Sequence, residues 1–387
     1  MRIENIMNNG KIKQAVYFLI QAILISSCSS GGNNSSSMQP ILNIDKFDSP
    51  IAISVARFND KSYIYLANAN DDTVTSCLLQ DDGLFSNCFI NGEDNDAFSY
   101  ISGVTVNSQN ATAYVLNSDS IAACPIDVTN GTLKECTTTN GKGTIVDPLS
   151  IAVNNAGTMA YIVNGNDTNT IAICQINSLG TITDCSITTG NGMFNYPSNI
   201  QLNSAMKVAY VLNGAGNTIS ICPLNNNGAL DTCVNSNGNG TFNAPGYIAV
   251  NTKASYAYIS NEDSTVSECH LSPTGTFDSC QKTSKDGSFN VVNAIQLNSH
   301  NTYAYFLNSG DSTIAQCSIL SSGELESCTV FENSAYNGIV SMVYANIGSF
   351  DFLYTSNYQG GTDTNKVAMG ICKFNSDMKL NECTGVE

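Results

Sequence analysis

The chain has 387 residues, of which 42% are hydrophobic and 12% are charged. Its 32 acidic and 15 basic residues give a formal net charge of -17, so the surface field repels phosphate backbones and we expect no nucleic-acid partner. The length is enough for one large domain or two modest ones.

The first 27 residues resemble a lipoprotein signal peptide. Basic residues precede an apolar run from Ala15 to Ile25, whose roughly 11 residues are too few to span a bilayer. Residues 25–28, Ile-Ser-Ser-Cys, resemble a bacterial lipobox, in which the cysteine is acylated and becomes the mature N-terminus. We therefore expect Cys28 to carry lipid, and Ser29 after it is typical of outer-membrane lipoproteins. The alternative is an ordinary secretory leader with Cys28 merely nearby.

Residues 28–39 are predicted to form the lipidated cysteine and a flexible tether, because they are rich in Ser, Gly and Asn. Residues 40–387 are predicted to form the folded body. We expect an exported monomer anchored to the cell envelope, at the outer membrane, facing the periplasm or the cell surface. It would contact the membrane through the lipid only.

The remaining fourteen cysteines fall into seven pairs, six with a spacing of 11 residues and one with a spacing of 12. The pairs are Cys77 and Cys88, Cys124 and Cys136, Cys174 and Cys185, Cys222 and Cys233, Cys269 and Cys280, Cys317 and Cys328, and Cys372 and Cys383. A Tyr-x-x-Asn motif stands upstream of each pair, and its tyrosines recur every 47 to 49 residues. A fixed period of this length is the signature of a repeat architecture.

Each repeat is predicted to contain four short strands. In one repeat, residues 200–202, 208–212, 218–222 and 230–234 are apolar stretches separated by Asn, Gly and Ser clusters, without helical periodicity. Five of the six shorter cysteine pairs have Gly second in the dipeptide at their midpoint, as in Asn227-Gly228, which predicts a two-residue type I′ turn.

Such a turn would place the two cysteines of a pair opposite each other, with Cβ atoms about 4.5 to 5.5 Å apart. We therefore predict one cross-strand disulfide per repeat, which an oxidising compartment preserves. Metal binding is the competing interpretation of so many cysteines. The chain has no CxxC motif and only two histidines, His270 and His300, so we expect no metal and no cofactor.

Seven four-stranded units predict an all-β fold, a seven-bladed β-propeller with four antiparallel strands per blade. The segments 161–164, 210–213 and 354–357, such as Tyr-Ile-Val-Asn, resemble the YVTN-repeat β-propellers of bacterial and archaeal surface and periplasmic proteins. The chain departs from that family by placing cysteines in the third and fourth strands of every blade. These propellers are related to lactonase-type propellers such as 6-phosphogluconolactonase, and fold does not settle function.

The first strands are expected near Ile53, Val104, Ile151, Ile200, Ile248, Ile295 and Val340. The stretch 41–46 is predicted to pair beside the last blade and help to close the ring. Phenylalanines recur in the loops that enter the blades, and we interpret them as packing between blades rather than as a stacking platform for sugars: Phe98, Phe194, Phe242 and Phe289. The repeated Tyr and Asn are interpreted as structural, because a binding site occurs once.

The loop between second and third strands is longest in the last repeat. From the motif Asn to the next cysteine there are 15 residues in that repeat and 7 to 10 in the others. A long loop on a rigid scaffold indicates function, so Tyr358, Gln359, Asp363 and Lys366 are candidate binding residues. The alternative is a tolerated surface insertion.

Acidic and amide side chains crowd the other loops of this kind, for example Asp71, Asp167 and Asp263. Calcium takes such ligands, but the spacing fits no known calcium loop, and turn capping explains them better. No catalytic motif is present, and the two histidines are expected to lie far apart without a nucleophile.

Three functions remain open from the sequence. The first is a non-catalytic binding scaffold for a protein or glycan partner on the loop face. The second is a lactonase-like or other hydrolase with a site at the mouth of the central channel. The third is a purely structural role in the envelope. An enzyme should show a cluster of ionisable groups around the channel.

Overall fold

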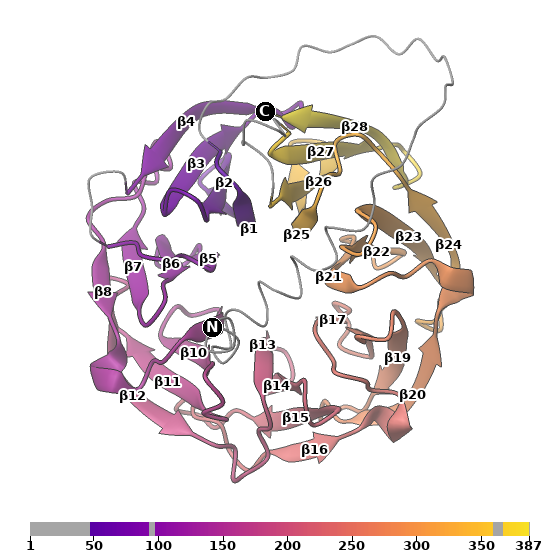
Figure 1. Cartoon of the computed structure of the whole chain (residues 1–387), viewed down its shortest axis with the longest axis horizontal. Coiled ribbons are helices and arrows are strands. Elements are labelled where there is room, and N and C mark those ends of the chain that lie inside the picture. The colour runs from indigo at the N-terminus through magenta and orange to yellow at the C-terminus, as the bar shows by residue number, and fades with distance from the viewer. Residues whose placement is uncertain (1–46, 93–96, 359–366, 387) are drawn as a thin grey trace, which may run out of the picture.

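The computed structural model describes residues 47–92, 97–358 and 367–386. These residues form seven four-stranded antiparallel sheets arranged around a central axis (Figure 1). The first strand of each sheet lies nearest the axis and the fourth lies at the periphery. The predicted seven-bladed β-propeller is therefore confirmed.

Each blade is one continuous segment of chain, with its strands paired in sequence order. Blades 1 to 4 contain β1 (Pro50–Phe58), β2 (Lys61–Asn68), β3 (Thr73–Leu79), β4 (Phe85–Asn91); β5 (Gly103–Asn107), β6 (Thr112–Leu116), β7 (Ile121–Pro125), β8 (Thr137–Thr139); β9 (Pro148–Val153), β10 (Met159–Asn164), β11 (Ile171–Ile176), β12 (Ile182–Thr188); and β13 (Pro197–Asn203), β14 (Val208–Asn213), β15 (Thr218–Pro223), β16 (Val234–Ser236). Blades 5 to 7 contain β17 (Ile248–Val250), β18 (Tyr256–Ser260), β19 (Val266–Leu271), β20 (Phe277–Thr283); β21 (Val292–Leu297), β22 (Tyr303–Asn308), β23 (Thr313–Ile319), β24 (Leu325–Phe331); and β25 (Ile339–Ile347), β26 (Phe350–Asn357), β27 (Met369–Phe374), β28 (Leu380–Val386).

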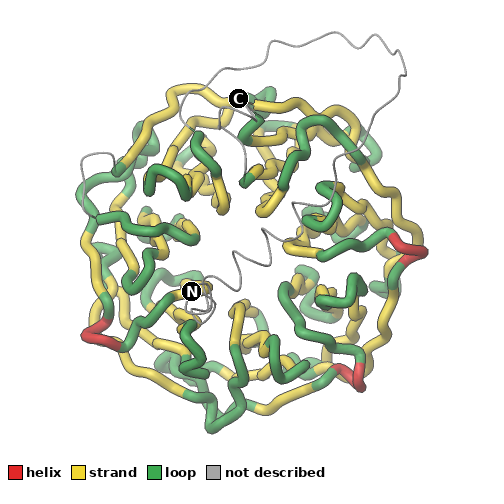
Figure 2. Tube along the Cα trace, viewed as in Figure 1, coloured by secondary structure: helices red, strands yellow, loops and turns green. Residues whose placement is uncertain are grey.

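Three short 3-10 turns in the entry loops interrupt the otherwise all-β fold (Figure 2). They are η1 (Gly141–Gly143), η2 (Gly238–Gly240) and η3 (Lys285–Gly287). The sequence shows no helical periodicity at these turns, because each is only three residues long.

The burial of each strand follows from its place in the blade. The second strand is covered by neighbouring blades on both faces, so β14 is buried at all six positions and its sequence is nearly continuous in apolar residues. The fourth strand lies at the periphery, and in β12 only Ile182 is buried. The four predicted entry-loop phenylalanines are all buried between blades, as expected.

In six of the seven blades the motif tyrosine joins its blade to the next, and Tyr65 of blade 1 is the exception. The hydroxyl of Tyr114 donates to the carbonyl of Gly180, and Tyr210 donates to Gly275, each in the 3–4 turn of the following blade. Burial raises the pKa of both tyrosines to about 12, so they remain protonated donors at neutral pH. The interpretation of the repeated tyrosines as structural is confirmed.

Among the described residues, the ring closes through the same type of contact. The Tyr354 hydroxyl of blade 7 donates to the Gly83 carbonyl of blade 1 at 3.0 Å. Phe47 and Phe85 pack in the apolar cluster between these blades. The predicted pairing of residues 41–46 beside the last blade lies outside the described residues.

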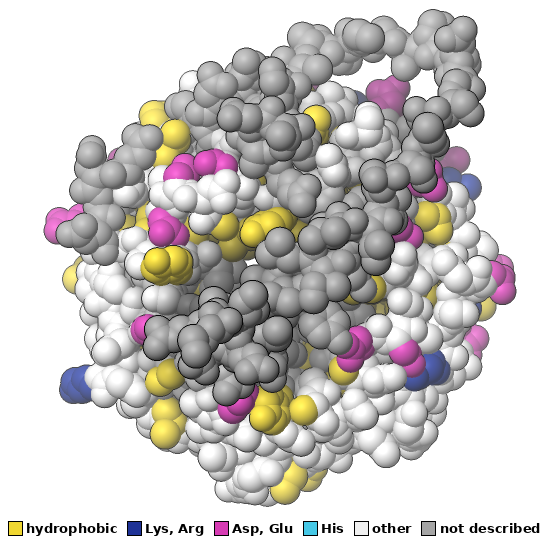
Figure 3. Space-filling model, viewed as in Figure 1, with side chains coloured by type: hydrophobic (Ala, Val, Ile, Leu, Met, Phe, Trp, Pro, Cys, Tyr) yellow, Lys and Arg dark blue, Asp and Glu magenta, His cyan; other side chains and the backbone are white. Residues whose placement is uncertain are grey.

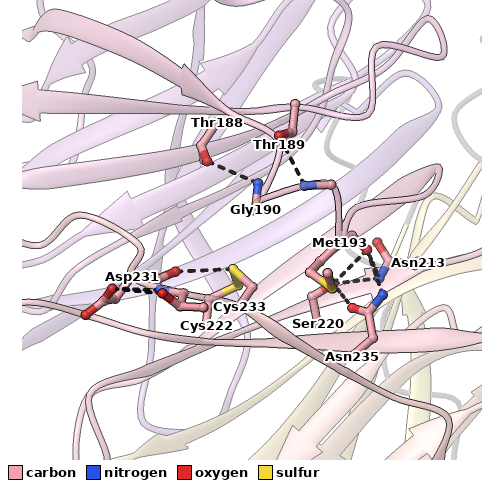
Figure 4. The surroundings of a disulfide bond; sticks show 12 residues. Thr188, Thr189, Gly190, Met193, Asn213, Ser220, Cys222, Asp231, Cys233 and Asn235 are labelled. Atoms are coloured by element: carbon pink, nitrogen blue, oxygen red, sulfur yellow. Dashed lines mark hydrogen bonds between the residues drawn. A yellow bond between two sulfur atoms is a disulfide. The ribbon is translucent and has the colours of Figure 1, made fainter.

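All seven predicted disulfides are present, one per blade, with Cα atoms 4.0 to 4.2 Å apart. Figure 4 shows the Cys222–Cys233 bond between β15 and the chain leading into β16. The fourth strand of blade 4 begins at Val234, so the predicted strand 230–234 is wrong in its bounds. Leu230 instead forms an isolated bridge with Leu224.

The predicted type I′ turn is also wrong. In blade 3 the Asn177 carbonyl accepts from Gly180, and only Gly180 of the dipeptide Leu179-Gly180 has a positive φ, at 81°. This is a type I turn followed by a left-handed glycine, which adds one residue to the loop. A bulge between the Cys174 and Ile176 pairs removes that offset, so Cys174 still lies opposite Cys185.

The predicted signal peptide (1–27) and the lipidated tether (28–39) lie outside the described residues. No helix within residues 47–92, 97–358 or 367–386 has the length and apolar character needed to cross a membrane.

Candidate functional site

One end of the ring, here called the loop face, carries the entry loops between blades and the loops between second and third strands. The motif asparagines fix these loops. In five blades the Asn side-chain oxygen accepts from a backbone N–H 18 residues earlier in the entry loop, as Asn213 does from Asn195 at 3.1 Å. Figure 4 shows Asn213 and Ser220 also donating to the Met193 carbonyl. In these five blades hydrogen bonds therefore hold the described entry loops of the loop face in place.

A second repeated feature lies where each entry loop leads into the innermost strand. The residue at this point has a φ between 41° and 66° in every blade: Ser49, Tyr100, Asp147, Tyr196, Ala244, Val291 and Gly338. We call these seven positions the rim. A left-handed conformation costs an L-residue roughly 1 to 2 kcal/mol, and glycine avoids that cost.

Side chains from the preceding blade hold the rim in place. The backbone N–H of Tyr196 donates to Asn169 at 2.6 Å, and that of Ala244 donates to Asn217 at 2.8 Å. In blade 2 the N–H of Ile101, next to Tyr100, donates to Asp72. The loop-face amides and carboxylates in these contacts therefore cap turns, as predicted. The described residues contain no group of three His, Cys, Asp or Glu side chains placed to hold a metal.

Two rim residues are large and exposed. Tyr100 is 74% exposed and Tyr196 is 48% exposed, whereas Ser49 and Asp147 are buried and the other three are partly buried. The two tyrosines flank the rim position of blade 3. Neither backbone preference nor packing accounts for an aromatic ring at these points. The sequence alone does not point to these two tyrosines, because the repeat gives no sign of a left-handed position.

The innermost strands present neutral hydrogen-bonding groups near the same rim. Ser150 of blade 3 donates to Asn199 of blade 4 at 3.0 Å, and Asn199 donates to the Gly246 carbonyl of blade 5. Among the described innermost strands, Arg57 is the one charged residue, and it lies at the opposite end of β1. The channel mouth is thus built from amides and hydroxyls.

Besides Asp147 at the rim, a second acidic residue is buried, and it lies between blades 5 and 6. Glu268 of β19 is 1% exposed, accepts from the Leu325 N–H at 3.0 Å and lies 3.7 Å from the Lys285 ammonium group. Burial raises the pKa of its carboxyl group. Gln316 holds the same position in blade 6 and makes the same type of contact to Leu380, so both residues brace blades.

The structure describes one of the four candidate binding residues. Tyr358 follows β26 on the loop face and is 36% exposed, and its N–H donates to the rim carbonyl of Gly338. Gln359, Asp363 and Lys366 lie outside the described residues. His270 lies in β19 and His300 in the loop between β21 and β22, so they belong to different blades.

The opposite end of the ring carries a groove of about 760 Å³ between blades 3 and 4. It is lined by amides such as Asn154 and Asn226 over apolar side chains such as Met159, with Lys207 as its one charged lining residue. This end carries the loops between first and second strands and the turns between third and fourth strands. The groove therefore shares no loop with the rim.

Figure 3 shows one face of the ring. Its described side chains are mostly neutral, with scattered acidic and apolar groups and few basic ones. An arrangement of this kind offers hydrogen-bond donors and acceptors without a strong positive field, which suits an uncharged partner.

No protein-family model and no curated protein sequence matches the chain. Solved structures do match its fold. A candidate 6-phosphogluconolactonase of Bacteroides fragilis is similar with a TM-score of 0.65 at 15% identity, over 85% of this chain and 96% of that one. A periplasmic gluconolactonase of Pseudomonas aeruginosa gives 0.64 at 11% identity, over 82% and 93%.

Hydrazine synthase of Kuenenia stuttgartiensis gives a TM-score of 0.61 at 10% identity, over 89% of this chain and all of that one. Identities this low show the fold alone, and the three proteins differ in their named activities. The neighbours therefore support the propeller architecture, and function has to be argued from the loop face itself.

Proposed function

We propose that this exported β-propeller is a binding scaffold that holds a protein or glycan partner on its loop face and performs no chemistry on it. The observation that carries the proposal is the rim. Seven left-handed positions form a polar surface without a basic residue, and two of them present exposed tyrosines. At four of the seven the backbone N–H donates to a side chain of the preceding blade. Rigid surfaces bind without a large ordering cost.

Seven disulfides support export, because such bonds persist in oxidising compartments. We propose further that Cys28 is acylated and anchors the body to the envelope. Metabolic labelling with a radioactive fatty acid should mark the wild type and leave Cys28→Ala unlabelled. Label on the Cys28→Ala protein would contradict acylation at Cys28.

The binding role is tested by capture from envelope extracts with the full chain in mild detergent. One variant shortens the loop 357–366 to the length found in the other blades, and a control variant, Leu179→Ala, alters an exposed side chain on the opposite face. We expect partners held by the wild type and the control and lost from the loop variant. Equal capture by all three would contradict a role of the long loop, and equal capture by a Tyr100→Gly/Tyr196→Gly variant as well would contradict a site on the loop face.

The second candidate is a lactonase-like hydrolase, favoured by the two gluconolactonase neighbours. Its test is hydrolysis of glucono-1,5-lactone and 6-phosphogluconolactone by the purified chain, measured as acid release above the spontaneous rate. If the chain hydrolyses a lactone and a substitution at the channel mouth, such as Asn199→Leu, abolishes this activity, the hydrolase would be supported and the scaffold proposal rejected.

A further inference from the structure

The two exposed rim tyrosines have no structural explanation. Each has a positive φ, 50° in both cases, at a point where blade 7 has glycine. Tyr100 is mostly exposed and Tyr196 is about half exposed, so burial accounts for little of the first residue and only part of the second. A residue type that is unfavourable for both backbone and packing is explained by something outside the fold.

From these residues we infer that the rim between Tyr100 and Tyr196 binds a neutral carbohydrate chain. This inference rests on the proposed function and names its partner class. The apolar face of a pyranose ring packs against an aromatic ring, and its hydroxyl groups both donate and accept hydrogen bonds. Side-chain amides and hydroxyls match such groups, and Asn195, Ser198 and Asn199 lie next to Tyr196 in the chain.

Charge selects against an acidic sugar. Asp72 caps the turn beside Tyr100, and Asp147 occupies the rim position between the two tyrosines. The chain also has a net charge of -17. A uronate, sulfate or phosphate group on the ligand would meet this field without a basic partner, because the seven rim residues include no Lys or Arg.

The surroundings also favour a glycan over a protein partner. Cores of protein interfaces gather aromatic residues, Met and Arg into one desolvated patch. The two tyrosines are instead separated by a blade whose rim residue, Asp147, is 1% exposed. A chain of sugars can contact two separated rings with successive residues while its hydroxyls remain hydrated between them.

Glycine substitutions test the site without harming the fold, because glycine suits a left-handed rim position. Tyr100→Gly, Tyr196→Gly and the double variant should keep or raise the melting temperature. Ala244→Gly is the matched control, since it makes the same change at a rim position without an aromatic ring. Tyr100→Phe and Tyr196→Phe keep the ring and should retain binding.

The probes are three soluble neutral polysaccharides, a β-1,3-glucan, a galactomannan and an α-1,4-glucan, each cast into native gels, with alginate as the acidic comparison. We expect at least one neutral gel to retard the wild type, the control and the Phe variants. Each single Gly variant should bind about tenfold more weakly, and the double variant should run as in a gel without polysaccharide.

Three outcomes would overturn the inference. These are free migration of the wild type in all three neutral gels, equal retardation of the double Gly variant, and stronger retardation in alginate. If the envelope capture experiment yields a protein partner that the double Gly variant loses, the scaffold proposal stands and the carbohydrate inference fails. Loss of capture with the long-loop variant alone would support the scaffold proposal with a partner that does not depend on the two tyrosines, and the carbohydrate inference would then be decided by the gels.

Discussion

The buried tyrosine hydroxyls show how one residue type can be essential in one blade and dispensable in another. Tyr354 donates to Gly83 across the closing interface, while the hydroxyl of Tyr65 in blade 1 is buried with no hydrogen-bond partner among the described residues. In blade 1 the neighbouring Tyr63 makes the contact to blade 2 instead, donating to the Thr129 carbonyl. The longer turn of blade 2 accounts for this exchange.

Replacing these hydroxyls should therefore have unequal effects. Tyr354→Phe should lower the free energy of unfolding by about 1 kcal/mol, because it leaves a buried carbonyl without a donor. Tyr65→Phe should leave it unchanged or slightly raise it. Denaturant unfolding of both variants beside the wild type measures the difference, and an equal loss in both would contradict the assignment.

Glu268 gives a pH-dependent prediction at the same scale. Its carboxyl pKa is higher in the folded protein than in the unfolded chain. Its contribution to stability is therefore full below the unfolded pKa and is lost as the pH rises through the folded pKa. Glu268→Gln removes this loss and keeps the hydrogen-bonding geometry that Gln316 shows in blade 6.

We expect Glu268→Gln to be more stable than the wild type at pH 7, with a smaller difference at pH 4. Melting temperatures across this range test the prediction, with Gln316→Glu as the reverse variant, which should lose stability as the pH rises. A difference between Glu268→Gln and wild type that does not change with pH would show that the carboxylate is fully compensated by Lys285.

At the scale of elements, the 3–4 turn explains what the sequence could and could not predict. The cysteine spacing predicted the correct disulfide register, although the turn that supports it was assigned incorrectly. The glycine adds one residue and the bulge removes it, so two deviations cancel over the distance between the cysteines. Bulges depend on the twist of neighbouring strands and leave little local sequence signal.

The same turn in blade 7 has Met378 in place of glycine, with a φ of 60°. Met378→Gly should raise the free energy of unfolding by roughly 1 kcal/mol, because it removes left-handed strain at a half-buried position. Thermal unfolding tests this. Gly323→Ala in blade 6 is the reverse comparison and should destabilise, since an added Cβ would lie 2.5 Å from the Tyr256 ring.

Each disulfide stabilises a single blade by restricting its unfolded chain. Replacing Cys174 and Cys185 together with alanine should cost about 3 kcal/mol, given the dozen residues that the bond encloses. The midpoint of denaturant unfolding under non-reducing conditions should fall accordingly. The single Cys185→Ala variant serves as a comparison and leaves one free thiol at Cys174.

At the scale of the whole molecule, the described residues form seven apolar clusters, one between each pair of neighbouring blades. Phe85 packs between blades 7 and 1, and Phe277 packs against Tyr210 and Phe242 between blades 4 and 5. Phe85→Ala and Phe277→Ala should each cost about 3 to 5 kcal/mol. A much larger loss for Phe85→Ala, measured by denaturant unfolding, would show that the closing interface carries extra strain.

The architecture was predictable from spacing, because the period of the Tyr-x-x-Asn motif sets the size of a blade. The candidate site was less accessible to sequence reasoning. Seven rim residues share a backbone conformation but no residue type, so Tyr100 and Tyr196 become visible only when the left-handed positions are aligned in space. Tyr196 stands before Pro197, which restricts its backbone but does not reveal its exposure.

All seven disulfides lie within single blades, and the interfaces between blades are non-covalent. Under mechanical load applied at its two ends, the chain would therefore lengthen blade by blade. In each oxidised blade the disulfide would prevent the residues between its two cysteines from being extended. A separation of 11 residues corresponds to a shortening of roughly 35 Å per blade. Stretched in an oxidising compartment, the protein would become a string of closed loops that keep their 3–4 turns, ready to rejoin their neighbours when the force is released.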